Sequence, residues 1–212
     1  MKTKLKELFE KHGQMIINLI LFVSFARFFA IQAIESYRNN EFGITEGIWV
    51  VHNIILTVII LIRKKHVSVQ SNYLHQTVAL AAFFSGAFLD LKIAASHDWQ
   101  LYVSNIILFI SVIAGMITLL NLGKSFGILI AVREVKTNGL YSIVRHPMYG
   151  TDILMRFGII FRHPSVLNLL IGIISTLIYV WRAILEERFL SQFPEYKEYM
   201  ERVRYRFIPG IF

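Results

Sequence analysis

The fold of this chain is decided around the stretch Gly-Leu-Tyr-Ser-Ile-Val-Arg-His-Pro-Met-Tyr, residues 139–149. This stretch stands directly before an apolar run, in a chain that is mostly apolar. It places a cation, a titratable ring and a phenol at the mouth of a predicted membrane span: Arg145, His146 and Tyr149. Polar groups in that position are costly unless they bind something. We therefore expect a binding site at this point of the chain.

The residues that follow predict a helical hairpin. Pro147 suits a first helical turn, because the N–H that proline lacks would have no partner there. Residues 163–164, His-Pro, then make a tight turn into the next apolar run. A second polar cluster, Arg182 with Glu186 and Glu187, lies at the end of that run. A hairpin brings both clusters to the same membrane face, where they are expected to form one site that opens onto the bilayer.

The composition favours a membrane protein. Of the 212 residues, 55% are hydrophobic and 17% are charged, below the ~25% charged residues of an average soluble domain. The net charge of +8 gathers in short clusters beside apolar runs, which fits lipid headgroups rather than nucleic acid. The chain has no cysteine, which excludes disulfides and thiolate metal ligands. We expect no metal and no nucleic acid among its partners.

Six apolar runs approach the roughly 20 residues that a helix needs to cross ~30 Å of hydrocarbon. The predicted spans are residues 14–34, 46–63, 73–95, 101–121, 147–161 and 164–184. The expected fold class is therefore all-α, a polytopic helical membrane protein with about six transmembrane helices. Residues 1–121 would hold four spans, and residues 122–212 a cytoplasmic loop, the hairpin and an amphipathic tail.

The positive charges indicate the orientation in the membrane. Lysine and arginine crowd the N-terminal segment, the loop after the second span, the 122–146 loop and the tail. The opposite loops hold only Arg38 and Arg162. By the positive-inside rule, both termini and the 122–146 loop are cytoplasmic. We expect a multi-pass protein of a bacterial inner membrane.

The tail beyond residue 184 differs in character. Pro194 starts a helix with apolar and aromatic residues on one face: Tyr196, Tyr199, Met200 and Val203. Such a helix is expected either to lie on the membrane or to cap the hairpin.

Polar residues also occur inside the predicted spans. Asp152 and Arg156 are four residues apart, so they are expected to form an internal ion pair or a polar wall of an acceptor pocket. Arg27 and the pair His52 and Asn53 are expected to bond other spans, with substrate contact as the alternative.

Three segments resemble the isoprenylcysteine carboxyl methyltransferase family. Residues 139–149 are similar to its signature, which reads Gly-Pro-Tyr, then Arg-His-Pro-x-Tyr. Residues 186–199 resemble its Glu-Glu tail, and residues 122–126 resemble the segment that precedes the signature. The resemblance covers residues 119–209. Two departures are Leu140, where the family has proline, and Phe193-Pro194 in place of Phe-Gly.

This resemblance implies a methyltransferase that uses S-adenosylmethionine and acts on a lipophilic or lipidated acceptor. The residues it implies for donor binding are Lys136, Leu140, Tyr141, Val144, Arg145, His146, Pro147, Tyr149 and Glu187. Arg182 and Glu186 are the predicted catalytic residues, with Arg182 orienting the acceptor. The chemistry is suitable, since a glutamate accepts hydrogen bonds from an amine or a ribose and tyrosines face adenine or a sulfonium.

Two other functions remain open at this point. A sterol- or enone-type reductase would share the architecture but use NADPH, and a transporter or scaffold would place polar residues along a path through the membrane. The acceptor is also open: an isoprenylcysteine carboxylate, a phospholipid amine, a quinone-like phenol and a small thiol all fit the pattern. The oligomeric state does not follow from the sequence.

Overall fold

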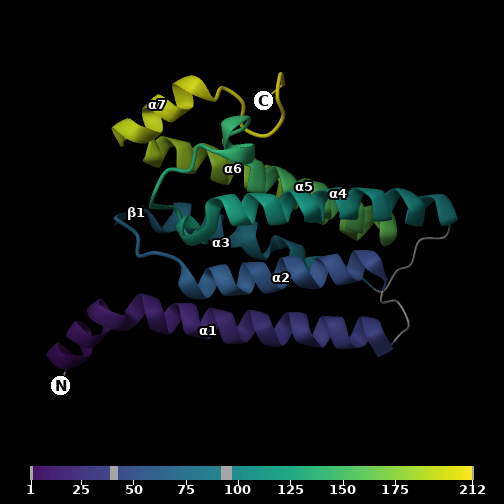
Figure 1. Ribbon diagram of the computed structural model, residues 1–212, viewed down its shortest axis with the longest axis horizontal. Coiled ribbons are helices and arrows are strands. Elements are labelled where there is room, and N and C mark those ends of the chain that lie inside the picture. The colour runs from purple at the N-terminus through teal and green to yellow at the C-terminus, as the bar shows by residue number, and fades with distance from the viewer. Residues whose placement is uncertain (1, 39–42, 92–96, 212) are drawn as a thin grey trace.

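The computed structural model describes residues 2–38, 43–91 and 97–211. It consists almost wholly of helices, so the expected all-α fold is confirmed (Figure 1). The α-helices are α1 (Lys2–Arg38), α2 (Ile44–Ile62), α3 (Tyr73–Phe84), α4 (Asp98–Leu122), α5 (Pro147–Arg162), α6 (Val166–Leu190) and α7 (Pro194–Arg202). Short elements join them: the 3-10 turns η1 (Ser85–Phe88), η2 (Gly123–Ser125) and η3 (Gly139–Ser142), and the strands β1 (Ser68–Val69) and β2 (Ala131–Val132).

The long helices run side by side along the length of the molecule (Figure 1). The helix α1 packs against α2 at one edge, α2 packs against α4, and α4 packs against α5. The hairpin of α5 and α6 forms as predicted, and α3 packs against α6. The N-terminus, β1 and α7 lie at one end of the bundle, which is the end that carries the 123–146 segment (Figure 1).

Four helices of the described part are long and apolar enough to cross a membrane: Gln14–Arg38, Ile44–Ile62, Asp98–Ser125 and Val166–Leu190. The other two predicted spans form shorter helices, with 12 residues in α3 and 16 in α5. At ~1.5 Å per residue, neither covers ~30 Å of hydrocarbon. Residues 92–95 of the predicted third span lie outside the described residues. The protein is thus a helical membrane protein, and six crossings stay a prediction.

The third segment continues along the bundle after its helix ends. Beyond Phe84 the chain forms η1 and then an extended stretch that reaches the start of α6. There the buried Asn168 side chain accepts a hydrogen bond from the Asp90 N–H (2.8 Å) and donates to the Asp90 and His163 carbonyls (2.8 and 2.7 Å). One amide therefore satisfies backbone groups that a continuous helix would have satisfied itself, as burial in an apolar medium requires.

The segment between α4 and α5 threads into the protein instead of forming a surface loop. Alternate residues are buried among the apolar side chains of α2, α3, α4 and α6: Phe126, Ile128, Ile130 and Val132. The Gln76 side chain of α3 holds the Ile130 backbone in both directions, donating to its carbonyl and accepting from its N–H, each at 3.0 Å. Antiparallel pairing of β1 with β2 continues this contact. The segment is therefore fixed in position as it approaches the hairpin.

The predicted amphipathic tail helix is present as α7. Tyr196, Tyr199 and Val203 are buried and pack against Val135 and Leu190. The apolar face of α7 thus packs against the end of α6. The helix therefore caps the hairpin, which is one of the two predicted alternatives.

Candidate functional site

The C-terminal tail returns to the start of α5 and is bonded to it. Val144 forms a parallel bridge with Tyr205. The N–H groups of Arg145 and His146 donate to the carbonyls of Tyr205 and Arg206, both at 2.9 Å. These bonds occupy two N–H groups just before α5, where a helix start leaves donors unpaired. They bring the signature residues and the tail into one unit.

Glu187 of α6 is the centre of a buried charge network. Its Oε1 accepts from Arg145 Nε at 2.7 Å and lies 3.1 Å from His146 Nε2. Its Oε2 accepts from Arg206 Nε at 2.9 Å. Both oxygens are therefore held within the protein, and Arg145 also donates through Nη1 to the Val203 carbonyl at 2.7 Å. This network ties α5, α6 and the tail together.

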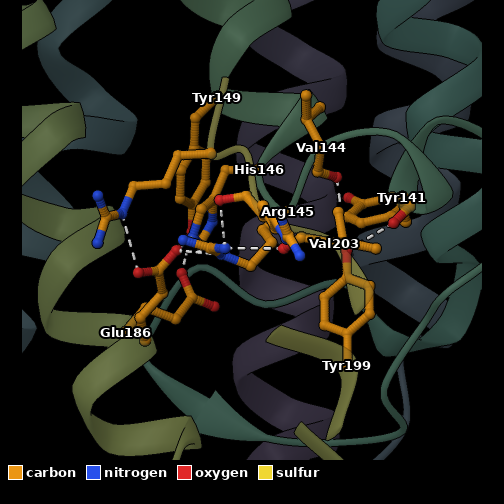
Figure 2. A network of polar contacts seen from close by, with 11 residues as sticks. Tyr141, Val144, Arg145, His146, Tyr149, Glu186, Tyr199 and Val203 are labelled. Carbon is orange, nitrogen blue, oxygen red and sulfur yellow. Dashed lines mark hydrogen bonds and ion pairs between the residues drawn. The ribbon is translucent and has the colours of Figure 1, made fainter. Parts of the chain in front are cut away.

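Glu186, the neighbouring residue, faces a different environment (Figure 2). Its Oε2 accepts a hydrogen bond from the Tyr149 hydroxyl. The Tyr149 ring stacks on the His146 ring, with centroids 5.1 Å apart and an interplanar angle of 10°. The Arg182 guanidinium also lies over the Tyr149 ring, 4.8 Å from the ring centroid. This is a favourable cation–π geometry.

A cavity of about 110 Å³ lies between the 125–136 segment, the signature and α7. Its polar and aromatic lining residues are Ser125, Arg133, Glu134, Lys136, Tyr141, Arg145, His146, Tyr149, Glu186, Tyr196 and Tyr199. The Ser125 hydroxyl is buried and has no hydrogen-bond partner among the described residues. The cavity therefore combines charges of both signs, tyrosine rings and an unpaired hydroxyl.

The charges around this cavity follow from burial and pairing. Burial lowers the pKa of Arg133, which the charge of Glu186 partly offsets. Hydrogen bonds from Lys136 and Lys64 lower the pKa of the exposed Glu134 carboxyl to about 2. Burial, reinforced by the charge of Glu186, raises the pKa of the Tyr141 phenol. At neutral pH the cavity thus presents a carboxylate at Glu134 and an uncharged phenol at Tyr141.

A second cavity of about 40 Å³ lies deeper in the bundle. It is lined by residues of α2, α3, α4, α5 and α6 and of the segment after α4: His52, Leu56, Phe83, Gly115, Leu119, Phe126, Gly127, Met148, Tyr149, Thr151, Asp152, Tyr179 and Arg182. Gly127, Met148 and Tyr149 line both cavities. Tyr149 therefore stands as a wall between an outer polar cavity and an inner, more apolar one.

The structure brings most of the predicted donor-binding residues to the outer cavity. Its lining includes Lys136, Tyr141, Arg145, His146 and Tyr149 of these, together with Glu186, which was predicted to be catalytic. The remaining predicted residues lie next to it but do not belong to its described lining: Leu140, Val144, Pro147 and Glu187. For Glu187 the reason is that two arginines and the His146 ring hold both of its oxygens.

Arg182 does not extend toward the membrane surface. It is buried, and its guanidinium donates to the carbonyls of Ala79 at 2.9 Å and of Ile128 at 2.8 Å. It thereby joins α6 to α3 and to the buried segment after α4. Its place is the wall of the inner cavity.

The predicted ion pair between Asp152 and Arg156 is wrong in detail. Arg156 donates to the backbone carbonyl of Asp152 at 2.8 Å, and the Asp152 carboxylate accepts from the Tyr179 hydroxyl at 2.7 Å. Tyr179 has replaced the cation as the carboxylate's partner. The prediction that Asn53 bonds another span is also wrong for its amide N–H group. This group donates to the Trp49 carbonyl of its own helix at 2.8 Å.

Sequence reasoning missed several residues of this region, among them Arg133, Ser125 and Arg206. Arg133 and Ser125 line the outer cavity, and Arg206 completes the charge network. The short, continuous apolar run at 126–132, Phe-Gly-Ile-Leu-Ile-Ala-Val, was a signal for a buried extended segment that leads to Arg133. For Arg206 there was no such local signal.

The fold and the site define a helical membrane protein with a polar, tyrosine-rich cavity at one end of its bundle. Residues 99–196 match the family model described as phospholipid methyltransferase. The match runs from α4 to the start of α7 and so includes most of the outer cavity. A search of curated proteins finds no match. This part of the chain is thus similar to membrane methyltransferases, and the match gives no support to a sterol- or enone-type reductase.

Proposed function

We propose that the protein transfers a methyl group from S-adenosylmethionine to a lipophilic acceptor that enters from the bilayer. The observation that carries this proposal is the pair of adjoining cavities that share Tyr149. One is polar and lies at the end of the bundle, as a water-soluble donor requires. The other lies among the helices that span the membrane, as a lipophilic acceptor requires.

The residues of the outer cavity fit the donor's chemical groups. Arg133 and Lys136 are cations suited to its carboxylate, and Glu186 is an acceptor suited to its amino group. The unpaired hydroxyl of Ser125 suits a ribose. Tyrosine rings suit an adenine or a sulfonium. The cavity of about 110 Å³ is smaller than the ~300 Å³ or more of typical ligand sites, so the donor must widen it on binding.

When bound, the donor supplies an activated methyl group on a positively charged sulfur. The contribution of the protein is to align the reactants and to exclude water. Buried Tyr196 and Tyr199 of α7 cover the outer cavity. The Tyr199 hydroxyl donates to the Tyr141 carbonyl at 2.7 Å, which holds this cover on the signature segment.

The proposed orientation places both termini and the outer cavity in the cytoplasm. Lysine and arginine are concentrated in the N-terminal segment, the loop after the second predicted span, the 122–146 loop and the tail, as the positive-inside rule expects of cytoplasmic segments. The donor then enters from the cytoplasm, while an acceptor with a long apolar chain enters laterally. Neither reactant has to cross a medium that does not solvate it.

Isothermal titration of the purified protein with S-adenosylmethionine and with NADPH tests the proposal. We expect micromolar binding of S-adenosylmethionine, about −8 kcal/mol, and none of NADPH. His146→Ala should weaken this binding roughly tenfold or more, because it removes a hydrogen-bonding ring from the lining of the outer cavity. Glu198→Gln, a change at an exposed position of α7, is the matched control and should bind as the parent does. Binding of NADPH alone would refute the proposal.

A further inference from the structure

His52 is a buried polar side chain in the lining of the inner cavity. It lies on α2, is only 7% exposed, and its Nδ1 has no hydrogen-bond partner among the described residues. Gly115 of α4 makes room for the ring, because a Cβ at that position would come within 3.1 Å of His52 Nε2. A buried polar atom without a partner is destabilising, so its retention at the wall of a cavity points to a ligand.

The other polar groups of the inner cavity limit what this ligand can be. The Arg182 guanidinium is engaged by the carbonyls of Ala79, Gly127 and Ile128, and only its Nε remains without a partner in the described part of the chain. The Asp152 carboxylate also lines the cavity. A carboxylate ligand would thus meet a negative charge and a cation whose donors are mostly occupied.

A ligand that donates a hydrogen bond meets acceptors in the inner cavity instead. A neutral imidazole has one ring nitrogen that accepts hydrogen bonds, and a carboxylate such as that of Asp152 accepts as well. The cavity of about 40 Å³ holds a small polar group rather than a whole lipid, since one water needs ~10–15 Å³ by the same measure. The inner cavity therefore suits the head of a molecule that carries an N–H or an O–H.

We propose that His52 is a catalytic residue that binds the N–H or O–H of the methyl acceptor and takes its proton. The acceptor class is then an alkyl amine or an alkylated phenol rather than a carboxylate. The acceptor's lone pair forms the new bond to the methyl carbon, the C–S electron pair stays on the donor's sulfur, and the acceptor's proton goes to His52 Nδ1. This inference rests on the proposed function. It assigns a role to α2, which lies outside the matched residues 99–196.

The test uses the full chain in detergent micelles and three probes with equal chains: dodecylamine, 4-dodecylphenol and dodecanoate. Methyl transfer is measured with labelled S-adenosylmethionine. Binding of each probe without the donor is measured by isothermal titration. The variants are His52→Gln, which can accept a hydrogen bond but not a proton, and His52→Leu, which can do neither. Thr57→Val is the matched control, because Thr57 is a buried residue of α2 whose hydroxyl bonds its own helix.

We expect the parent to methylate the amine or the phenol and to leave dodecanoate unchanged. His52→Gln should lower kcat about 100-fold, as expected for loss of a proton acceptor, while the same probe still binds. His52→Leu should also weaken that binding tenfold or more, and Thr57→Val should match the parent in both assays.

Three results would overturn the inference. They are preferred methylation of dodecanoate, failure of the parent to bind the amine and the phenol, and parent-like kcat in both His52 variants. The last is the result expected if His52 only holds a trapped water. Failure of the proposed function is recognised separately, because the parent would then not bind S-adenosylmethionine, whereas binding of the amine or phenol would still report on His52.

Discussion

Glu186 and Glu187 are neighbours at the end of α6, but their carboxylates serve different purposes. Glu186 lines the outer cavity, and its contact with Tyr149 leaves one oxygen for a ligand. We expect Glu186→Gln to weaken binding of S-adenosylhomocysteine by about 1.5–3 kcal/mol, the contribution of a hydrogen bond to a charged group. Isothermal titration measures this loss. The melting temperature should change little, since the amide oxygen still accepts from Tyr149, and a large drop would contradict the assignment.

Glu187→Gln should produce the converse result. The change removes the charge that balances buried Arg145 and compensates Arg206. Breaking a buried ion pair typically costs about 3–5 kcal/mol, which lowers the melting temperature by roughly 10 °C in a chain of this size. Thermal unfolding followed by tryptophan fluorescence checks this expectation. Unchanged stability combined with lost donor binding would instead make Glu187 a donor ligand, as the sequence predicted.

This difference between adjacent residues shows where sequence reasoning ended. The motif predicted that the signature and the Glu-Glu pair would meet, and they do. It did not indicate which glutamate faces the cavity, because successive helical residues point about 100° apart and the helix rotation depends on packing. The position of Arg206 beside Glu187 depends on the path of the returning tail, which is a tertiary property.

At the scale of elements, the third segment depends on a side chain from another helix. Asn168→Ala would leave the Asp90 N–H and the carbonyls of Asp90 and His163 without their present partner. Since each of these three hydrogen bonds contributes about 0.5–1.5 kcal/mol, we expect a destabilisation of about 3 kcal/mol. Thermal unfolding measures it. The control Thr176→Val removes a hydroxyl that donates to the Gly172 carbonyl of its own helix and should be milder. Equal melting temperatures for both variants would disprove the role of Asn168.

The sequence predicted the existence of these elements better than their lengths. Residues 73–95 are apolar throughout most of their length, so composition favoured a full span. The helix instead ends at Phe84, and Ser85 donates to the Ala82 carbonyl and accepts from Arg156. Composition measures burial in an apolar medium, but the end of this helix is set by Arg156 and Asn168, which lie far away in the sequence.

For the whole molecule, the proposed orientation can be tested with single cysteines in the cysteine-free chain. Asp98, Thr137 and Glu195 are exposed. With cytoplasmic termini, an impermeant maleimide applied from outside should label Asp98→Cys and should label Thr137→Cys and Glu195→Cys only after permeabilisation. These two positions lie on the segment and the helix that bound the outer cavity. Labelling of Thr137→Cys from outside would reverse the orientation.

Lateral entry predicts a dependence on the acceptor's apolar chain. Each buried methylene contributes about 0.8 kcal/mol, so shortening the chain of an accepted probe should lower kcat/KM roughly fourfold per methylene. A series of alkylphenols of decreasing chain length gives the measurement. A short, soluble phenol that is methylated as efficiently as the long-chain one would refute entry from the bilayer.

The position of Tyr149 has a thermodynamic consequence. Its ring lines both cavities and contacts both His146 and Arg182. A ligand that widens the outer cavity therefore changes the shape of the inner one. Linkage makes such an effect reciprocal, so the factor by which the donor changes acceptor affinity equals the factor by which the acceptor changes donor affinity. Through the Tyr149 ring, the occupancy of the outer cavity by a water-soluble donor would thereby depend on the occupancy of the inner cavity by a lipophilic acceptor.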